Sequence, residues 1–397
     1  MLSAAASIVG VAMFRKVTMG VQYQRAVSLR GLCKGARECK QGVSRKESVM
    51  EFYITRIASC ERLQSDLKHG RYRLRRGKKV QIYRPKRREA ESPYFRDRVW
   101  QRSMCNNGVY DDLTRGFILD NIACQKGKGN DMAIRRVIRF LQTLYRSDPD
   151  APIYGVHLDI RKYFPSTPHA LVKAMDAARV KEPMFLQYLE EIVDGYNDER
   201  SLDVIAADPF GARGTGLGSQ INQLNQIALI NPLDHELKRL CRFYIRYNDD
   251  FLILTHDKAI AERAKCIVCE WLKSHGLEMT DKSGIFTVNH GFYFLRKRFI
   301  VKPGGKIIIR LHKRALSDER AQLRRLHTAV KAGEKTMVDV HNHYQSWVAN
   351  AEYAGDAPIR AMDAYYCELF GQKPQYKRKR RYLYGNYQQP ARPGASP

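Results

Sequence analysis

The chain has 397 residues, 44% of them hydrophobic and 10% aromatic, which is a globular composition long enough for two or three lobes. Its 69 Lys and Arg residues against 41 Asp and Glu residues give a net charge of +28. This surplus predicts a polyanionic partner bound through phosphate contacts. An anionic membrane is the competing partner, but no basic amphipathic helix or spanning segment stands out in the sequence.

Residues 1–46 are assigned to an N-terminal leader. Residues 1–14 are apolar, but they are too short to span a bilayer and lack the preceding positive residues of a signal peptide. Translation starting at Met13, Met19 or Met50 is the alternative.

The nine cysteines are odd in number and irregularly spaced, which argues against a disulfide framework and fits a reducing, cytoplasmic location. Cys266 and Cys269 have the spacing of metal ligands, but they lie within an apolar pattern of helical period. We therefore expect both to be core residues.

Basic segments dominate the first part of the chain after the leader. Lys86 and Arg88 lie on an extended stretch, where Arg can bind phosphate through two hydrogen bonds and Lys as a point charge. A solvated basic strand is the alternative. Further on, a Gly-Lys-Gly turn at residues 127–129 precedes a predicted helix that begins near Asp131, and this turn lacks the Walker spacing.

A lone carboxylate ends the next apolar run. Residues 153–164 contain a single acid, Asp159, which is followed by two cations and two aromatic residues. A lone acid at the end of a strand that looks buried is unusual. Farther along, residues 171–210 carry a helical pattern and an acidic stretch that we expect to be solvated.

Residues 216–223 form a glycine-rich loop before a predicted helix. The glycines allow the backbone to approach a template base or an incoming nucleotide closely, although an ordinary loop before a helix has the same pattern.

Residues 243–254 predict a tight hairpin, because two apolar, aromatic runs flank an Asn-Asp pair that tolerates turn conformations. Asp249 and Asp250 then lie at its tip. Adjacent carboxylates between apolar strands favour a bound cation, and Asp159 with Asp249 could hold two Mg²⁺ ions about 3.5–4 Å apart. Two solvated turn aspartates are the alternative.

These segments, in this order, resemble the motifs of bacterial reverse transcriptases. Asp159 corresponds to motif A and the Tyr-Asn-Asp-Asp run ending at Asp250 to motif C, and residues 216–223 resemble motif B with Asn222 where Ser is usual. Residues 276–283 resemble motif D, with Ser283 where the family commonly has Thr.

The resemblance implies an RNA-directed DNA polymerase, in which a primer 3′-hydroxyl attacks the α-phosphate of a dNTP. Phe164, five residues after Asp159, would exclude the ribose 2′-hydroxyl, and the Ser283 variant leaves open whether Lys282 protonates pyrophosphate. The implied catalytic and metal-binding groups, for Mg²⁺ or Mn²⁺, are Asp159, Asp249, Asp250 and the backbone carbonyl of Ile160. The implied dNTP-binding residues are Lys86, Arg88, Arg161, Lys162, Phe164, Gly218, Gln223 and Lys282. The implied primer grip is Phe294, Leu295 and Arg296, with Arg296 in place of the usual Gly.

The implied fold is α+β, a right-hand polymerase with fingers, a palm built on an antiparallel sheet and a helical thumb. The expected boundaries are fingers at 47–150, palm at 151–300 with fingers elements at 171–215, thumb at 301–372, and a basic disordered tail at 373–397.

The implied partners are an RNA template, a DNA or RNA primer and dNTPs, with a noncoding RNA or an accessory protein as further candidates and no membrane. Among compact bacterial reverse transcriptases, the motif variants favour the diversity-generating retroelement and the unclassified or phage-defence groups. Two alternatives stay open: a template-independent nucleotide polymerase in phage defence, and a noncatalytic RNA-binding scaffold.

Overall fold

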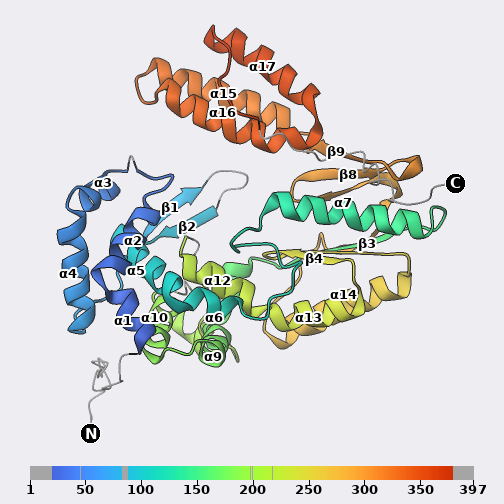
Figure 1. Cartoon of the computed structure of the whole chain (residues 1–397). Helices are drawn as coiled ribbons and strands as arrows, with labels where there is room; N and C mark the ends of the chain where they lie inside the picture. The colour runs from blue at the N-terminus through green and yellow to red at the C-terminus, as the bar shows by residue number, and fades with distance from the viewer. Residues whose placement is uncertain are drawn as a thin grey trace, which may run out of the picture. The chain divides into compact units, whose positions relative to one another are not determined.

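The computed structural model describes residues 20–44, 46–82, 88–196, 198, 200–216 and 218–378 (Figure 1). The chain divides into two compact units. The first comprises residues 1–129, 157–251 and 263–284, and the second comprises residues 130–156, 252–262 and 285–397. Helices and antiparallel strands occur together, so the predicted α+β class is confirmed.

A four-stranded sheet carries the predicted catalytic residues. Its strands are β3 (Tyr154–Asp159), β4 (Tyr244–Tyr247), β5 (Asp250–Thr255) and β6 (Gly284–Thr287), in the order β4-β5-β3-β6. Both apolar runs that the sequence predicts as strands are therefore strands, and β3 and β5 are neighbours.

The N-terminal part of the first unit is helical. Its helices are α1 (Val21–Val27), α2 (Leu29–Cys39), α3 (Glu47–Ile54), α4 (Arg56–Lys68) and α5 (Phe95–Met104). Tyr23 and Leu32 are fully buried, and a Cβ added at Gly35 of α2 would lie 2.9 Å from the Val99 carbonyl of α5. The assignment of residues 1–46 to a leader is therefore wrong for α1 and α2, which form part of a hydrophobic core. Residues 1–19 lie outside the described part.

Aromatic rings fill the centre of this core. Trp100 lies 5.2 Å from Tyr188 and 6.0 Å from Tyr23, measured between ring centroids. The remaining elements of the unit are the antiparallel hairpin β1 (Lys78–Ile82) and β2 (Arg88–Ser92), the π-helical turn η1 (Cys105–Val109), α6 (Tyr110–Thr114), α8 (Tyr163–Ser166), α9 (His169–Arg179), α10 (Pro183–Asp194), α11 (Leu202–Ala207), α12 (Gln220–Leu229) and α13 (Asn231–Leu240). Helix α14 (Lys258–Ser274) begins in the second unit and ends in the first.

The second unit contains α7 (Asn130–Ser147), a three-stranded antiparallel sheet and three C-terminal helices. The sheet strands are β7 (Phe292–Phe294), β8 (Lys297–Val301) and β9 (Ile307–Leu311), and the helices are α15 (Ala315–Lys331), α16 (Met337–Ala351) and α17 (Asp356–Phe370). The short 3-10 turns η2 (Val288–His290), η3 (Pro303–Gly305) and η4 (Glu352–Ala354) connect them. Tyr344 of α16 and Tyr366 of α17 are fully buried between these helices.

Two sequence expectations are corrected here. Residues 373–378 are not a disordered tail, because the Gln345 side chain accepts a hydrogen bond from the Lys377 amide at 2.6 Å and donates one to its carbonyl at 2.9 Å. Residues 379–397 lie outside the described part. Cys266 of α14 is exposed rather than buried, because it lies off the apolar stripe of its helix. Across the described part of the chain, no helix has the length and apolarity needed to cross a membrane.

Candidate active site

The Asn248-Asp249 pair forms the turn between β4 and β5, as the sequence predicts. Asn248 has a φ of +55°, the left-handed region that Asn tolerates better than most residues. Asp250 begins β5 and is partly buried. The two carboxylates are therefore presented on a turn whose backbone conformation depends on Asn248.

A buried arginine, Arg246, stabilises this turn through hydrogen bonds. Arg246 and Asp234 are both fully buried, and the guanidinium binds the Asp234 carboxylate through Nε at 2.7 Å and Nη2 at 2.6 Å. Arg246 Nη1 also donates to the Asn248 carbonyl at 2.8 Å. Burial alone would lower the pKa of Arg246, but the charge and hydrogen bonds of Asp234 raise it, so the group stays protonated.

Sequence reasoning did not identify Arg246 as a positioning residue. The available signal was a cation inside an otherwise apolar strand, since a buried arginine requires an acidic partner. Its partner lies on α13, and the Tyr244 hydroxyl also donates to Asp234, at 2.6 Å. The register of the turn is thus tied to α13 through Asp234.

Asp159 lies at the end of β3 and is partly buried. Two residues earlier on the same strand face, His157 Nε2 makes a short hydrogen bond to Asp250 Oδ1. The end of β3 and the beginning of β5 therefore meet, and they bring together the two segments that resemble motifs A and C. His157 was not singled out from the sequence, although the two-residue period of a strand places it beside Asp159.

The pKa of His157 depends on its burial and on two neighbouring acids. Burial alone would lower the pKa of His157, but the hydrogen bond to Asp250 and the charges of Asp250 and Asp159 raise the pKa above its usual value of 6.5. The two acids therefore favour the protonated imidazolium over the neutral ring.

The segment after α14 pairs with the end of β3. The Thr280 amide donates to the Asp159 carbonyl at 2.8 Å, and the Asp159 amide donates to Ser283 Oγ at 3.0 Å. The Ser283 hydroxyl thus holds the backbone of Asp159, a role that either Ser or Thr can fill. Ser283, which stands where the family commonly has Thr, therefore retains the hydroxyl group.

The donor chemistry of this site suits a divalent cation. Mg²⁺ and Mn²⁺ prefer carboxylate and carbonyl oxygens, which Asp159, Asp249, Asp250 and the carbonyl of Ile160 would supply. One oxygen of Asp250 is engaged by His157. Within the described ranges, no three His, Cys, Asp or Glu side chains are gathered closely enough to form a metal site. The metal assignment therefore stays a prediction.

The residues after Asp159 differ in their contacts. Arg161 is exposed and pairs with Asp281 at 2.6 Å and with Glu278 at 3.7 Å, so its guanidinium binds acids of the motif D segment. Lys162 is exposed in a left-handed conformation, with φ at +47°. Phe164 is half-buried in α8, and its carbonyl accepts a hydrogen bond from the Thr215 amide at 2.9 Å.

Gly218, in the segment that resembles motif B, is required by the local backbone geometry. Gly218 has a φ of +116°, and a Cβ there would lie 2.6 Å from the carbonyl of Glu91 in β2. This glycine allows contact between the loop and the hairpin, which is a different reason from the nucleotide contact expected from sequence. Ser219 caps α12, accepting a hydrogen bond from the Asn222 amide at 3.2 Å, and Gln223 is exposed on the first turn of that helix.

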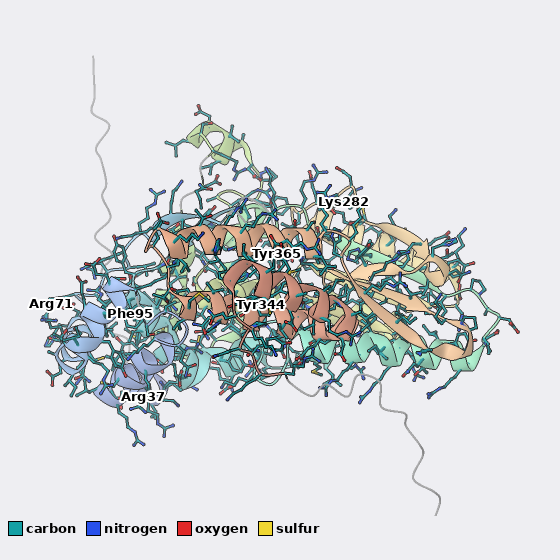
Figure 2. All side chains as sticks on the ribbon, turned by 90° about the horizontal axis from the view of Figure 1, so that it is seen from above. Arg37, Arg71, Phe95, Lys282, Tyr344 and Tyr365 are labelled. Carbon is teal, nitrogen blue, oxygen red and sulfur yellow. The ribbon has the colours of Figure 1, made fainter. Side chains whose placement is uncertain are left out.

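Three further dNTP candidates lie away from the candidate catalytic turn in sequence. Lys86 lies outside the described residues, and Arg88 is described only as the first backbone position of β2. Lys282 is exposed at the surface (Figure 2).

The predicted primer grip is the turn between β7 and β8. Phe294 is 1% exposed and belongs to the core, so its side chain is not available to a primer. Leu295 and Arg296 form the two-residue turn, with φ values of +48° and +62°. Arg296 is exposed, and its backbone adopts the left-handed turn despite its side chain.

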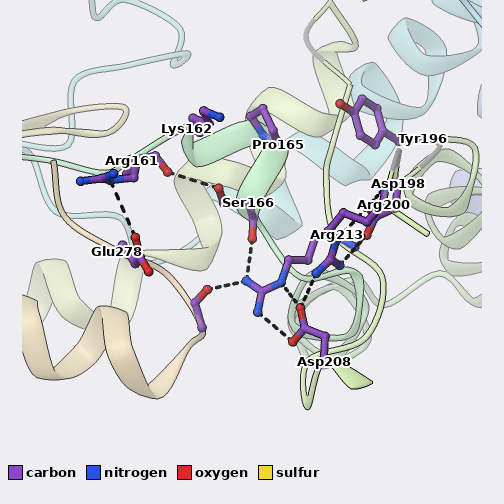
Figure 3. Close-up of a pocket in the computed structure, with 11 residues that line it drawn as sticks. Arg161, Lys162, Pro165, Ser166, Tyr196, Asp198, Arg200, Asp208, Arg213 and Glu278 are labelled. Carbon is purple, nitrogen blue, oxygen red and sulfur yellow. Dashed lines mark hydrogen bonds and ion pairs between the residues drawn. The ribbon is translucent and has the colours of Figure 1, made fainter. Parts of the chain in front are cut away.

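An ion-pair cluster that sequence reasoning missed borders a surface pocket of about 670 Å³ beside Arg161 and Lys162 (Figure 3). The cluster consists of Asp198, Arg200, Asp208 and Arg213. Arg200 binds Asp198 at 2.5 Å and Asp208 at 2.6 Å, and Arg213 binds Asp208 at 2.5 Å. Hydrogen bonds from Arg200 lower the pKa of Asp198 to about 2. The expectation of a solvated acidic stretch is therefore wrong for Asp198. Its carboxylate pairs with Arg200 and also accepts a hydrogen bond from the Arg213 amide.

No known family model matches the chain, and no curated protein matches it. Among solved structures, the fold is similar to telomerases. Apo telomerase from Candida tropicalis, truncated from the C-terminal domain, is 11% identical, with a TM-score of 0.42 over 62% of this chain and 59% of that chain. Telomerase from Candida albicans in complex with the TWJ fragment of telomeric RNA is 13% identical, with a TM-score of 0.41 over 79% of this chain and 58% of that chain.

The chain thus spans less than two thirds of the length of these telomerases. At such TM-scores, the similarity assigns neither an activity nor a partner to this chain.

Proposed function

We propose that the protein is an RNA-directed DNA polymerase that adds dNTPs to a primer 3′-hydroxyl, with the first unit carrying palm and fingers. The observation that carries this proposal is the meeting of β3 and β5 through His157 and Asp250. It brings Asp159 to the turn that carries Asp249 and Asp250. The resemblance of these two segments to motifs A and C supports the same function.

The protein's own groups would hold the reacting atoms in place. Asp159, Asp249, Asp250 and the Ile160 carbonyl would bind two divalent ions, which would activate the primer hydroxyl and stabilise the leaving pyrophosphate. Arg246 fixes the turn through the Asn248 carbonyl, and Ser283 fixes the amide of Asp159. Such preorganisation lowers the entropic cost of aligning the primer 3′-hydroxyl with the dNTP.

The net charge of +28 supports a nucleic-acid substrate. On the second unit, Arg320 and Arg324 of α15 are exposed beside Tyr365 of α17. Figure 2 labels Tyr365. Cations interleaved with an aromatic ring suit contacts to a phosphate backbone and sugars. We assign this face to the thumb that would bind the product duplex.

Within this function, we place the polymerase with the compact bacterial reverse transcriptases of the diversity-generating or the unclassified and phage-defence groups. The support is the Gly-x-x-x-Asn-Gln run ending at Gln223 and the Asn at position 248. A template and variable repeat pair in the neighbouring DNA would identify the first group. A neighbouring toxin or structured noncoding RNA would identify the others.

The test is incorporation of labelled dNTPs by the purified protein on primed poly(rA), with Mg²⁺ or Mn²⁺. The expected result is extension with dTTP that is abolished in Asp249→Asn/Asp250→Asn. A matched control is Asp203→Asn/Asp318→Asn, which removes the same charge from two exposed positions and should retain extension.

Other outcomes identify the alternatives. Incorporation that does not require the template would indicate a template-independent polymerase. RNA binding by both the parent protein and the Asp249→Asn/Asp250→Asn variant, without incorporation by either, would indicate a noncatalytic scaffold.

A further inference from the structure

A second pocket in the first unit is lined in part by Gly218 and Gln220 of the glycine-rich segment. Its volume is about 380 Å³, within the range of roughly 300–1,000 Å³ typical of ligand sites. Helices α2, α5 and α12 and the loop before α7 form its walls. The side chains that define its chemistry are Arg98, Gln101, Arg102, Cys124, Gln220 and Gln223.

The charge of this pocket is positive and only partly compensated. Arg98 and Arg102 contribute two guanidinium groups, and Glu38 is the single acid on the wall. Glu38 lies 3.6 Å from Arg102 Nε and accepts a hydrogen bond from Asn106 at 2.9 Å. One cation is thus left without a balancing acid in the wall, which suits a ligand with a single phosphate better than a triphosphate.

Four glutamines line the pocket, and besides Gln41 they are Gln101 of α5 and Gln220 and Gln223 of α12. Gln101 is 2% exposed and accepts a hydrogen bond from the Ser219 hydroxyl at 2.9 Å. Within the described part of the chain, its amide nitrogen donates no hydrogen bond, although the residue lines the pocket. Gln220 and Gln223 present two more amides from the first turn of α12. Amides that both donate and accept can read the edge of an unpaired base, and guanidinium planes can stack on its face.

The pocket adjoins the candidate catalytic turn. Cys124 lies on the pocket wall, and its Sγ is 3.9 Å from Gln223 Oε1 and 3.7 Å from Asn248 Oδ1. Asn248 directly precedes Asp249 in the turn. One side chain therefore separates the pocket from the turn that carries two of the three predicted catalytic carboxylates.

We propose that this pocket binds a single unpaired nucleotide of the RNA template, the one adjacent to the position being copied. Arg98 and Arg102 bind its phosphate, and the amides of Gln101, Gln220 and Gln223 bind its base. The inference rests on the proposed polymerase function and adds to it a defined site for the single-stranded template. A dNTP is a poorer fit, because Glu38 would repel its triphosphate.

The first experiment uses the unaltered protein and measures the alkylation of its cysteines by mass spectrometry. Of the nine cysteines, Cys124 and Cys266 are exposed. Cys124 lines the pocket, as does the buried Cys39, whereas Cys266 lies outside it. Burial of its surroundings raises the pKa of the Cys124 thiol, so labelling is done at alkaline pH. The probes are a primer and RNA-template duplex with an unpaired 5′ template extension, the same duplex with a flush end, and AMP alone.

The expected result is that the extended duplex slows the alkylation of Cys124 roughly tenfold and leaves that of Cys266 unchanged. The flush duplex should give much less protection. Equal protection by both duplexes, or none by either, would overturn the proposal. Protection by AMP alone at comparable concentration would also overturn it, because the pocket would then be a mononucleotide site.

The second experiment compares two arginine variants. Arg102→Ala removes a pocket cation, and Arg37→Ala removes the same charge from an exposed position of α2 outside the pocket (Figure 2). Losing one charged hydrogen bond should weaken binding of the extended duplex roughly tenfold in Arg102→Ala, relative to the flush duplex. Arg37→Ala should change both duplexes equally. A preference for the extended duplex that survives in Arg102→Ala contradicts the proposal.

Failure of this inference and failure of the proposed function are distinguishable. Templated dTTP incorporation without selective protection of Cys124 would leave the polymerase in place and remove the template site. Selective protection of Cys124 without any incorporation would keep the nucleotide site and remove the polymerase.

Discussion

Arg246 is the residue on which the candidate catalytic turn most depends. It joins the buried Asp234 carboxylate to the Asn248 carbonyl, so one side chain links the core to the turn. Removing one partner of a buried ion pair leaves the other charge uncompensated.

We therefore expect Arg246→Met to lower the free energy of unfolding by about 3–5 kcal/mol, measured by urea titration. The exposed Arg242→Met, four residues earlier, should change it by less than about 0.5 kcal/mol. Adding Asp234→Asn to Arg246→Met should cost less than the sum of the two single changes, because the substitutions remove the same pair. Additive losses would show that the pair is not coupled.

His157 gives the site a pH dependence whose sign follows from its raised pKa. A histidine whose folded pKa lies above 6.5 stabilises the folded state fully below that value, and this contribution disappears as the pH rises through the folded pKa. In EDTA, His157→Gln should thus lower the melting temperature at pH 5.5 and have progressively less effect toward pH 8.5. The exposed His290→Gln serves as the control. A difference that grows with pH would contradict the assignment.

Phe164 tests which sugar the site accepts. If its ring occupies the space of a ribose 2′-hydroxyl, Phe164→Ala should raise the incorporation of NTPs relative to dNTPs roughly tenfold or more. The ratio of the two kcat/KM values is the measurement, because a general loss of folding would lower both. An unchanged ratio with retained dNTP incorporation would show that Phe164 is only a packing residue.

At the scale of elements, local patterns predicted the parts of the site that are close in sequence. The apolar runs ending at Asp159 and flanking Asn248 predicted strands and a tight turn, and both are present. Contacts between distant segments were not predictable in this way. The Ser283 hydroxyl reaches the Asp159 amide across 124 positions, and no periodicity in either segment encodes that pairing.

Two larger elements escaped sequence analysis for physical reasons. Helices α1 and α2 lie next to an apolar, unassigned N-terminal stretch, and their burial comes from α5, far along the chain. The cluster of Arg200 and Arg213 with Asp198 and Asp208 carries balanced charges, so its sequence resembles a solvated loop. In both cases, contacts with distant residues determine whether the segment is buried or paired, and the local composition does not.

The β7–β8 turn stores backbone strain at a predicted primer contact. Leu295 and Arg296 both adopt left-handed conformations, which cost roughly 1–2 kcal/mol for a residue with a Cβ. Leu295→Asn/Arg296→Gly should therefore raise the free energy of unfolding by about 1–2 kcal/mol and weaken primer binding. Arg296→Ala should weaken primer binding without stabilising the fold. A stabilised double variant with unchanged primer affinity would argue against a role in the primer grip.

At the scale of the whole molecule, the charge of +28 predicts that RNA affinity depends strongly on salt. Each phosphate neutralised on a single strand contributes about 0.7 to the slope of log Kd against log salt concentration. The described residues include exposed cations on several elements, among them Arg37 of α2 and Arg324 of α15. Both units are thus expected to contribute to the slope.

The basic C-terminal stretch allows the most direct test of this charge model. Residues 373–378 are held against α16, so a chain ending at residue 378 keeps the contacts of Gln345 with Lys377 and loses four cations, Lys379, Arg380, Arg381 and Arg392. If all four contact phosphate, the salt slope for single-stranded RNA should fall by roughly 3. Replacing the same four residues with Gln in the full chain should have the same effect. An unchanged slope in both would show that RNA binding resides on the folded units, because the stretch would then be making no phosphate contacts.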